Sequence, residues 1–132
     1  MEILVDANVL IDYAEGAQYA VSFFNKAMRE NYEIKVVTAV YEEARLMSDS
    51  FNKIETLISM LRKYSIYEKI IPTEQERTAA KKMFQECARA GRALDFADVL
   101  QIVIAKQTSW MLFTRDREMK ETALKKGVKL FS

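Results

Sequence analysis

The sequence predicts an α/β fold with a mainly parallel central sheet. Short apolar runs, such as ILV at residues 3–5, alternate along the chain with longer segments whose apolar residues recur at helical spacing. Strands that alternate with helices pair in parallel, because each helix carries the chain back across a face of the sheet. The 132 residues, 50% of them hydrophobic, are expected to form one domain, residues 1–132, with its own core.

The first half of the chain contains strand patterns separated by helical ones. Residues 3–5 are an apolar run ended by an aspartate, which is typical of a strand buried on both faces. Residues 40–64 have a helical pattern, with a break expected near residues 48–50. Residues 66–71 fit either a short strand or an extended connection. The other elements expected here are helices at residues 8–14 and 18–31 and a strand at residues 34–38.

The second half continues the alternation. Residues 95–106 are apolar nearly all round, so a helix there is expected to be buried. Gly91 and Gly127 are expected to end helices, since glycine readily adopts the left-handed conformation found after many helices. The other expected elements are helices at residues 74–90 and 117–126 and strands at residues 111–114 and 128–131.

The composition excludes several classes of catalytic site. The chain has no histidine, which excludes Ser-His-Asp and Cys-His nucleophilic sites and histidine-containing zinc sites. The three glycines are too few and too scattered for a glycine-rich phosphate loop. The single cysteine, Cys87, excludes an internal disulfide and fits a reducing compartment. The classes that remain are a catalytic site built on carboxylates, a catalytic site built on lysine, and a protein without a catalytic site.

The sequence also predicts a soluble, cytoplasmic protein with no membrane partner. No apolar run approaches the roughly 18 residues that a membrane-spanning helix needs. The first six residues, MEILVD, are acidic where a secretory signal peptide would be basic.

Four acidic residues are expected to meet at one edge of the sheet. Asp6 and Asp116 follow predicted strands, Glu43 lies one turn into the helix after another, and Asp98 opens the buried helix. Clustered carboxylates repel one another and raise one another's pKa, and a divalent cation offsets that repulsion. Hard oxygen ligands suit Mg²⁺ or Mn²⁺, the usual ions of phosphoryl transfer. Such chemistry needs no histidine base.

Purely structural roles are the alternative for these acids. Asp95 and Asp98 have the spacing of a helix N-cap and its third residue, and Asp116 is placed to cap the next helix. Glu43 has the equally acidic Glu42 beside it, and either is compatible with a solvated helix position. Asp6 interrupts a buried run, where a carboxylate needs a hydrogen-bonding partner or an ion.

Four short segments span nearly the whole chain: VDANVLI at residues 5–11, TAVYEE at 38–43, LDFADVL at 94–100 and FTRDRE at 113–118. Together, and in this order, they resemble the PIN-domain nuclease family, and within it the VapC-like toxin ribonucleases. The first resembles that family's opening D-x-N segment, the second its Ser/Thr followed five residues later by Glu, the third its Asp that opens a hydrophobic helix, and the fourth its T-x-D segment.

The resemblance implies a three-layer α/β/α sandwich and a Mg²⁺- or Mn²⁺-dependent endoribonuclease. By this resemblance, the catalytic and metal-binding residues are Asp6, Glu43, Asp98 and Asp116. It also implies supporting polar roles for Asn8, Thr114 and Asp95. Ala44 departs from the leucine that commonly follows the second acid, and Asp95 stands where the family often has a cap, so Asp95 is either a cap or an extra ligand. The resemblance further suggests a small antitoxin partner and a homodimer.

The charge distribution is compatible with an RNA substrate although the net charge is only +1. Residues 1–66 carry a net charge of −3 and residues 67–132 a net charge of +4. Basic residues near the third and fourth acidic segments are candidates for phosphate binding: Arg89, Arg92, Arg115, Arg117 and Lys120. The alternative is that these residues simply lie on the solvent-exposed faces of helices and bind nothing. The corresponding alternative for the whole chain is a non-catalytic PIN-like module that binds RNA or a protein.

Overall fold

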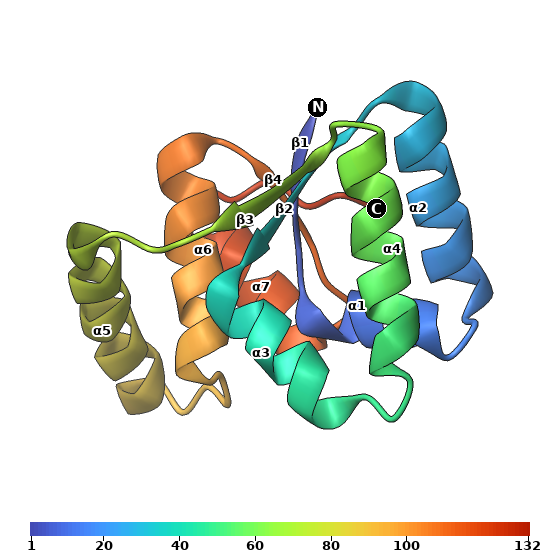
Figure 1. Cartoon of the computed structure of the whole chain (residues 1–132). Helices are drawn as coiled ribbons and strands as arrows, with labels where there is room; N and C mark the ends of the chain where they lie inside the picture. Colours follow the sequence, from blue (N-terminus) through green and yellow to red (C-terminus); the bar gives the residue numbers. More distant parts are fainter.

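The fold is built on one four-stranded parallel sheet, described by a computed structural model of residues 1–132 (Figure 1). Its strand order is β3-β2-β1-β4, so β1 lies in the interior of the sheet. Ile3 pairs with Ile34 on one side and with Met111 on the other. The strands are β1 (Glu2–Val5), β2 (Glu33–Val37), β3 (Tyr67–Ile70) and β4 (Met111–Phe113).

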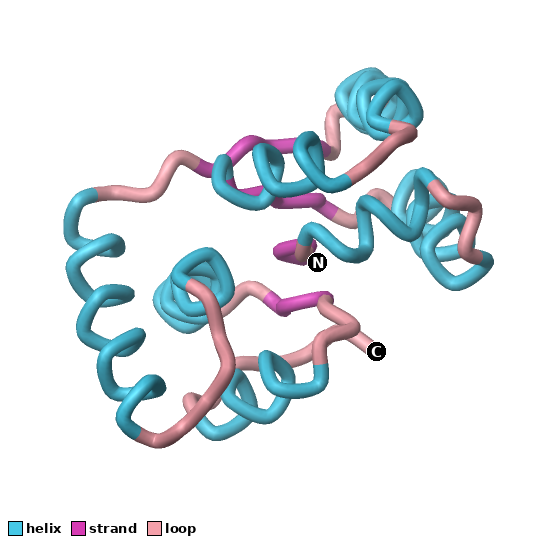
Figure 2. The backbone as a smooth tube through the Cα atoms, turned by 90° about the horizontal axis from the view of Figure 1, so that it is seen from below, coloured by secondary structure: helices cyan, strands magenta, loops and turns pink.

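Helices cover both faces of the sheet and confirm the expected three-layer α/β/α sandwich (Figure 2). One layer holds α1 (Ala7–Ala14), α2 (Gln18–Glu30), α3 (Thr38–Met47) and α4 (Phe51–Lys63). The other holds α5 (Glu74–Arg89), α6 (Phe96–Thr108) and α7 (Arg117–Lys125). In this second layer α6 packs between α5 and α7.

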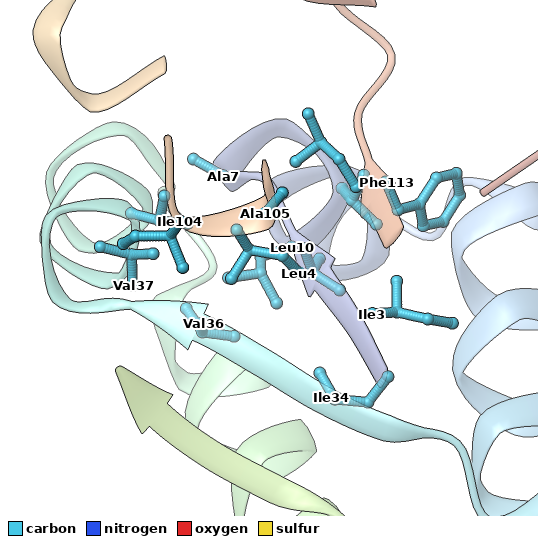
Figure 3. Close-up of a cluster of buried hydrophobic side chains, with 14 of the residues drawn as sticks. Ile3, Leu4, Ala7, Leu10, Ile34, Val36, Val37, Ile104, Ala105 and Phe113 are labelled. Carbon is cyan, nitrogen blue, oxygen red and sulfur yellow. The ribbon is translucent and has the colours of Figure 1, made fainter. Parts of the chain in front are cut away.

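The core forms where the apolar strands meet α1 and α6 (Figure 3). The side chains of Ile3, Leu4 and Val5 are inaccessible to solvent, as expected for a strand covered on both faces. The helix α6 is buried over the whole of Val99–Ala105, which confirms the expectation from its uniform hydrophobicity. The core therefore holds β1 and α6 rigidly beside each other, and both lead to the predicted acidic residues.

Two ambiguous regions have definite structures. The helical pattern of residues 40–64 is split into α3 and α4, and the backbone N–H of Ser50 donates to Ser48 Oγ in the break between them. Residues 67–70 form β3, which pairs in parallel with β2. The uncertain segment is therefore an edge strand and not a connection.

The expected last strand at residues 128–131 is wrong. Only Leu130 forms a parallel bridge, and its partner is Leu112. Leu112 donates to the Lys129 carbonyl and accepts from the Phe131 N–H, so a single residue of β4 makes both hydrogen bonds. Val128 does not extend this pairing, because its N–H donates to the Ala123 carbonyl at the end of α7. No helix in the structure has both the length and the hydrophobicity needed to cross a membrane.

Candidate active site

The predicted acidic residues approach one another at the carboxyl edge of the sheet, which is the lower edge in Figure 1. Asp6 directly follows β1, and Asp116 follows β4 after two residues. Glu43 lies in the second turn of α3, which begins directly after β2. Asp98 lies in the first turn of α6. Parallel strands end at the same edge, so elements far apart in the sequence place their acids together there.

Asp6 is the most enclosed of these acids, with 5% of the residue exposed. Its Oδ1 accepts hydrogen bonds from the Ala7 N–H at 2.8 Å and from Gln101 Nε2 at 3.0 Å. Its Oδ2 accepts from the Thr114 hydroxyl at 2.7 Å. A buried carboxylate is stable only with such donors, and these three fix the orientation of the Asp6 side chain.

Asp95 and Asp98 form a capping box at the start of α6. Asp95 Oδ1 accepts from the Asp98 N–H at 2.8 Å, and Asp98 Oδ2 accepts from the Asp95 N–H at 3.2 Å. Burial and the charges of Asp95, Asp6 and Asp116 raise the pKa of Asp98 to about 7, against the lowering effect of the hydrogen bond from Asp95. Asp98 is thus a capping residue and also a member of the acidic cluster, and Asp95 is an N-cap.

Of the adjacent pair on α3, it is Glu43 that approaches the other acids. Glu43 is half-buried, and burial together with the charges of Asp95 and Asp6 raises its pKa. Glu42 is exposed to solvent. The side chains thus distinguish two neighbours that the sequence leaves equivalent.

Asp116 is connected to Asp6 through Thr114. The buried Thr114 hydroxyl donates to Asp6 and accepts from the Asp116 N–H at 3.1 Å. Asp116 itself caps α7, where its Oδ1 accepts from the Met119 N–H at 2.9 Å. Asp116 therefore does cap a helix, as the alternative interpretation predicts. It also lies near the other acids, because its charge contributes to the raised pKa of Asp98.

The predicted basic residues do not form one patch. Arg115 and Lys120 line the same pocket beside the acids, whereas Arg92 lines a different pocket and donates to the Thr122 hydroxyl at 3.2 Å. Arg117 forms an exposed ion pair with Glu121 on its own helix, at 3.3 Å. Arg89 is exposed at the end of α5. Arg115 and Lys120 are thus the two that share a surface.

Gln101 is a site residue that sequence reasoning missed. It is inaccessible to solvent on α6 and donates to Asp6, while its Oε1 has no hydrogen-bond partner. The available signal was an amide in the middle of the apolar run at residues 99–105, one turn after Asp98. A buried amide in such a helix needs a polar partner, and here the partner is the carboxylate at the end of β1.

Replacing Gln101 by leucine is expected to lower the free energy of unfolding by about 1–2 kcal/mol. The substitution removes a hydrogen bond to a buried carboxylate but keeps a side chain of similar volume, so no large cavity is left. Urea unfolding measures this change. Gln107→Leu is the matched control, since Gln107 is exposed on the same helix. Equal stability of the two variants would mean that the hydrogen bond to Asp6 contributes nothing.

The side-chain oxygen atoms at this edge of the sheet are of the chemical type that Mg²⁺ and Mn²⁺ prefer as ligands. All are hard oxygens, and the carboxylates raise one another's pKa, a repulsion that a cation relieves. The amide oxygen Oδ1 of Asn8 is buried without a hydrogen-bond partner, so it also has a lone pair to offer. No three acidic side chains are arranged closely enough to hold an ion as they stand. Binding would therefore require side-chain adjustment.

The comparisons with known proteins agree on the family and the fold. The family model of the PIN domain matches residues 3–125 of the chain. No curated protein sequence matches the chain. Among solved structures, VapBC2 from Rickettsia felis, bound to a DNA fragment from its promoter, is similar with a TM-score of 0.69 and 14% identity over 92% of each chain.

Two further structures are similar over almost their whole length. FitAcB from Neisseria gonorrhoeae has a TM-score of 0.69 and 19% identity, over 98% of this chain and 96% of that one. VapBC-1 from nontypeable Haemophilus influenzae has a TM-score of 0.66 and 15% identity, over 100% of this chain and 98% of that one. The match to the PIN domain covers all four acidic segments, and the chain therefore belongs to the PIN domain family.

Proposed function

We propose that this protein is a Mg²⁺- or Mn²⁺-dependent endoribonuclease. The observation that carries the proposal is the convergence of acids from four separate segments at one edge of a PIN fold, with Asp6 oriented by three hydrogen bonds. PIN domains are generally nucleases, and PIN nucleases generally use divalent metals. The charge distribution and the basic pair Arg115 and Lys120 favour a nucleic-acid substrate, and the family resemblance implies that it is RNA.

In this proposal four acids hold the divalent ion: Asp6, Glu43, Asp98 and Asp116. The bound ion supplies an activated water and stabilises negative charge on the phosphate. Thr114 and Gln101 act on Asp6, whose carboxylate they keep in one orientation. Asn8 contributes its unpartnered amide oxygen. As the family resemblance implies, the cut is expected to leave a 5′-phosphate and a 3′-hydroxyl.

A toxin role with an antitoxin partner and a homodimeric state belongs to the same proposal. It is supported by the likeness in fold to the structures named VapBC2, FitAcB and VapBC-1. Leu46 and Met47, at the end of α3, are 83% and 70% exposed, and adjacent exposed apolar side chains favour a protein contact. Light scattering of the purified protein, alone and with a candidate antitoxin, measures both associations.

A second candidate is a non-catalytic PIN-like module that binds RNA or a protein. The observation that favours it is that no three acidic side chains are placed to hold an ion without adjustment. Mn²⁺ titration separates the candidates, because a module with an idle site gains no thermal stability from the ion.

The decisive assay measures cleavage of single-stranded RNA with Mg²⁺ or Mn²⁺, beside a DNA of the same sequence. Cleavage of RNA that stops on chelation is the expected result. Glu43→Gln is expected to lower the rate more than tenfold, whereas Glu42→Gln, which removes a charge one residue away on the exposed face, retains it. RNA cleavage that survives chelation would contradict the metal-dependent mechanism, and cleavage of DNA alone would contradict the substrate.

A further inference from the structure

A pocket of about 410 Å³ opens beside the candidate active site, between α2, the end of β4 and α7. This volume lies in the range of small-ligand sites. Its wall is a cluster of aromatic rings from three segments of the chain: Phe23, Phe113 and Phe131 pack with ring centroids 4.5 to 5.2 Å apart. Tyr19 packs edge-on to Phe113 at 6.2 Å. Tyr19 and Phe131 are partly exposed and present ring surface to the pocket.

Cationic side chains surround the same pocket. Arg115, Lys120 and Lys26 line it, and the Arg115 guanidinium lies over the Tyr19 ring, 4.1 Å from its centroid. Neither Arg115 nor Lys120 forms an ion pair in the structure, whereas Lys26 is 3.8 Å from Glu30. Two cations without a carboxylate partner, next to exposed ring surface, suit a ligand that has both an anionic and a planar group.

The pocket and the acidic cluster are joined by one short segment. Phe113 and Arg115 line the pocket, and Thr114 between them donates to Asp6. Asp116 follows immediately and contributes to the raised pKa of Asp98. Successive Cα atoms are only 3.8 Å apart, so a group held in the pocket lies close to one held at the acids.

We propose that this pocket binds one nucleotide of the RNA, next to the phosphate that is cleaved. The base stacks against the aromatic wall and the Arg115 guanidinium, and Arg115 and Lys120 contact its phosphate. The proposal rests on the ribonuclease function but adds a base-binding subsite to it. Because every base has a ring face that can stack on an aromatic side chain, this mode of binding predicts little preference among the bases.

Binding to short RNAs that carry one abasic nucleotide each tests the proposal without cleavage. The protein carries Asp98→Asn, which removes a proposed metal ligand, so that the RNA is expected to stay intact even though the solution contains Mg²⁺. Fluorescence anisotropy is expected to show one position at which loss of the base weakens binding about tenfold, the effect of one stacked base. Arg115→Ala, added to the same protein, is expected to weaken binding of intact RNA and to remove most of that positional effect.

Arg62→Ala is the matched control. The Arg62 guanidinium also lies over a tyrosine ring, that of Tyr67 at 5.2 Å, but lines none of the pockets. It is expected to leave the abasic pattern unchanged. Arg115→Lys keeps the charge but not the planar group, so it should retain more affinity for intact RNA than Arg115→Ala while still flattening the pattern.

Two results would overturn the subsite. One is equal affinity for every abasic RNA, and the other is a positional effect that survives Arg115→Ala. Because binding is measured in protein that does not cleave, these outcomes are independent of the ribonuclease assay. A wild-type protein that never cuts RNA but shows the Arg115-dependent pattern would lose its proposed function and keep this subsite.

Discussion

Asp6→Asn is expected to lower RNA cleavage by more than about a hundredfold while leaving the protein folded. Loss of a residue that supports a metal ligand typically costs 10- to 100-fold, and Asp6 is proposed as a ligand itself. The new amide keeps its oxygen at the Oδ1 position, where it accepts from the Ala7 N–H and from Gln101 Nε2, and places its NH₂ group toward Thr114. The Thr114 hydroxyl can respond, because it rotates and accepts from the new NH₂ group instead of donating.

This accommodation predicts a loss of only about 1–2 kcal/mol in the free energy of unfolding, the cost of one weakened hydrogen bond to a charged group. Initial rates of RNA cleavage at saturating Mn²⁺, beside urea unfolding of the same preparation, measure the two effects. Asp49→Asn is the control, since Asp49 is exposed in the turn between α3 and α4. If the Asp6→Asn variant cleaves RNA at the wild-type rate, Asp6 is not part of the proposed site.

Asp98→Asn is expected to stabilise the metal-free protein above pH 7 by about 1–2 kcal/mol. In the folded state the pKa of Asp98 is raised to about 7 from an ordinary value of 3.8, so the folded protein holds a proton that the unfolded chain has released between these values. Stability of the wild type therefore falls as the pH rises from about 4 to about 7. The full shift would correspond to roughly 4 kcal/mol, which solvent access to the partly exposed side chain reduces.

Urea unfolding of the wild type and Asp98→Asn at pH 4, 6 and 8 in chelator measures this difference, which should be absent at pH 4 and largest at pH 8. Adding Mn²⁺ at about 100 times its dissociation constant should reverse the order, since binding would stabilise the wild type by about 2.7 kcal/mol. Asp49→Asn, at an exposed turn, controls for loss of charge. A stability difference that does not change with pH would show that burial and the neighbouring carboxylates do not raise the pKa of Asp98.

The alternation of strands and helices allowed most of the fold to be predicted, because buried parallel strands and amphipathic helices have distinct apolar periods. The positions of Asp6 and Asp116 at strand ends then brought them to one edge, as parallel pairing requires. The segment at residues 128–131 was assigned wrongly because its first residue, Val128, bonds to the end of α7, so that only Leu130 pairs with β4. Local apolar runs contain no such information.

The unpredicted parts of the site are contacts between distant residues. Gln101 donates to Asp6, 95 positions away in the chain, and nothing near either residue indicates the pairing. The choice of Glu43 over Glu42 depends on the rotation of α3 relative to α6, which two adjacent glutamates do not reveal. Conversely, capping and clustering appeared as alternatives in the sequence although the structure combines them in Asp98 and Asp116.

The combination of helix capping and clustering in the same acids has a consequence for how this site persists during evolution. Asp6, Asp98 and Asp116 each accept a backbone N–H at a helix start, an interaction that typically contributes about 1 kcal/mol to folding. Selection for a folded protein therefore retains these side chains even where selection for catalysis has ceased. A descendant that has lost its activity would still display the acidic signature, and inactivation should be sought first at Glu43, the one acid of the four with no such bond.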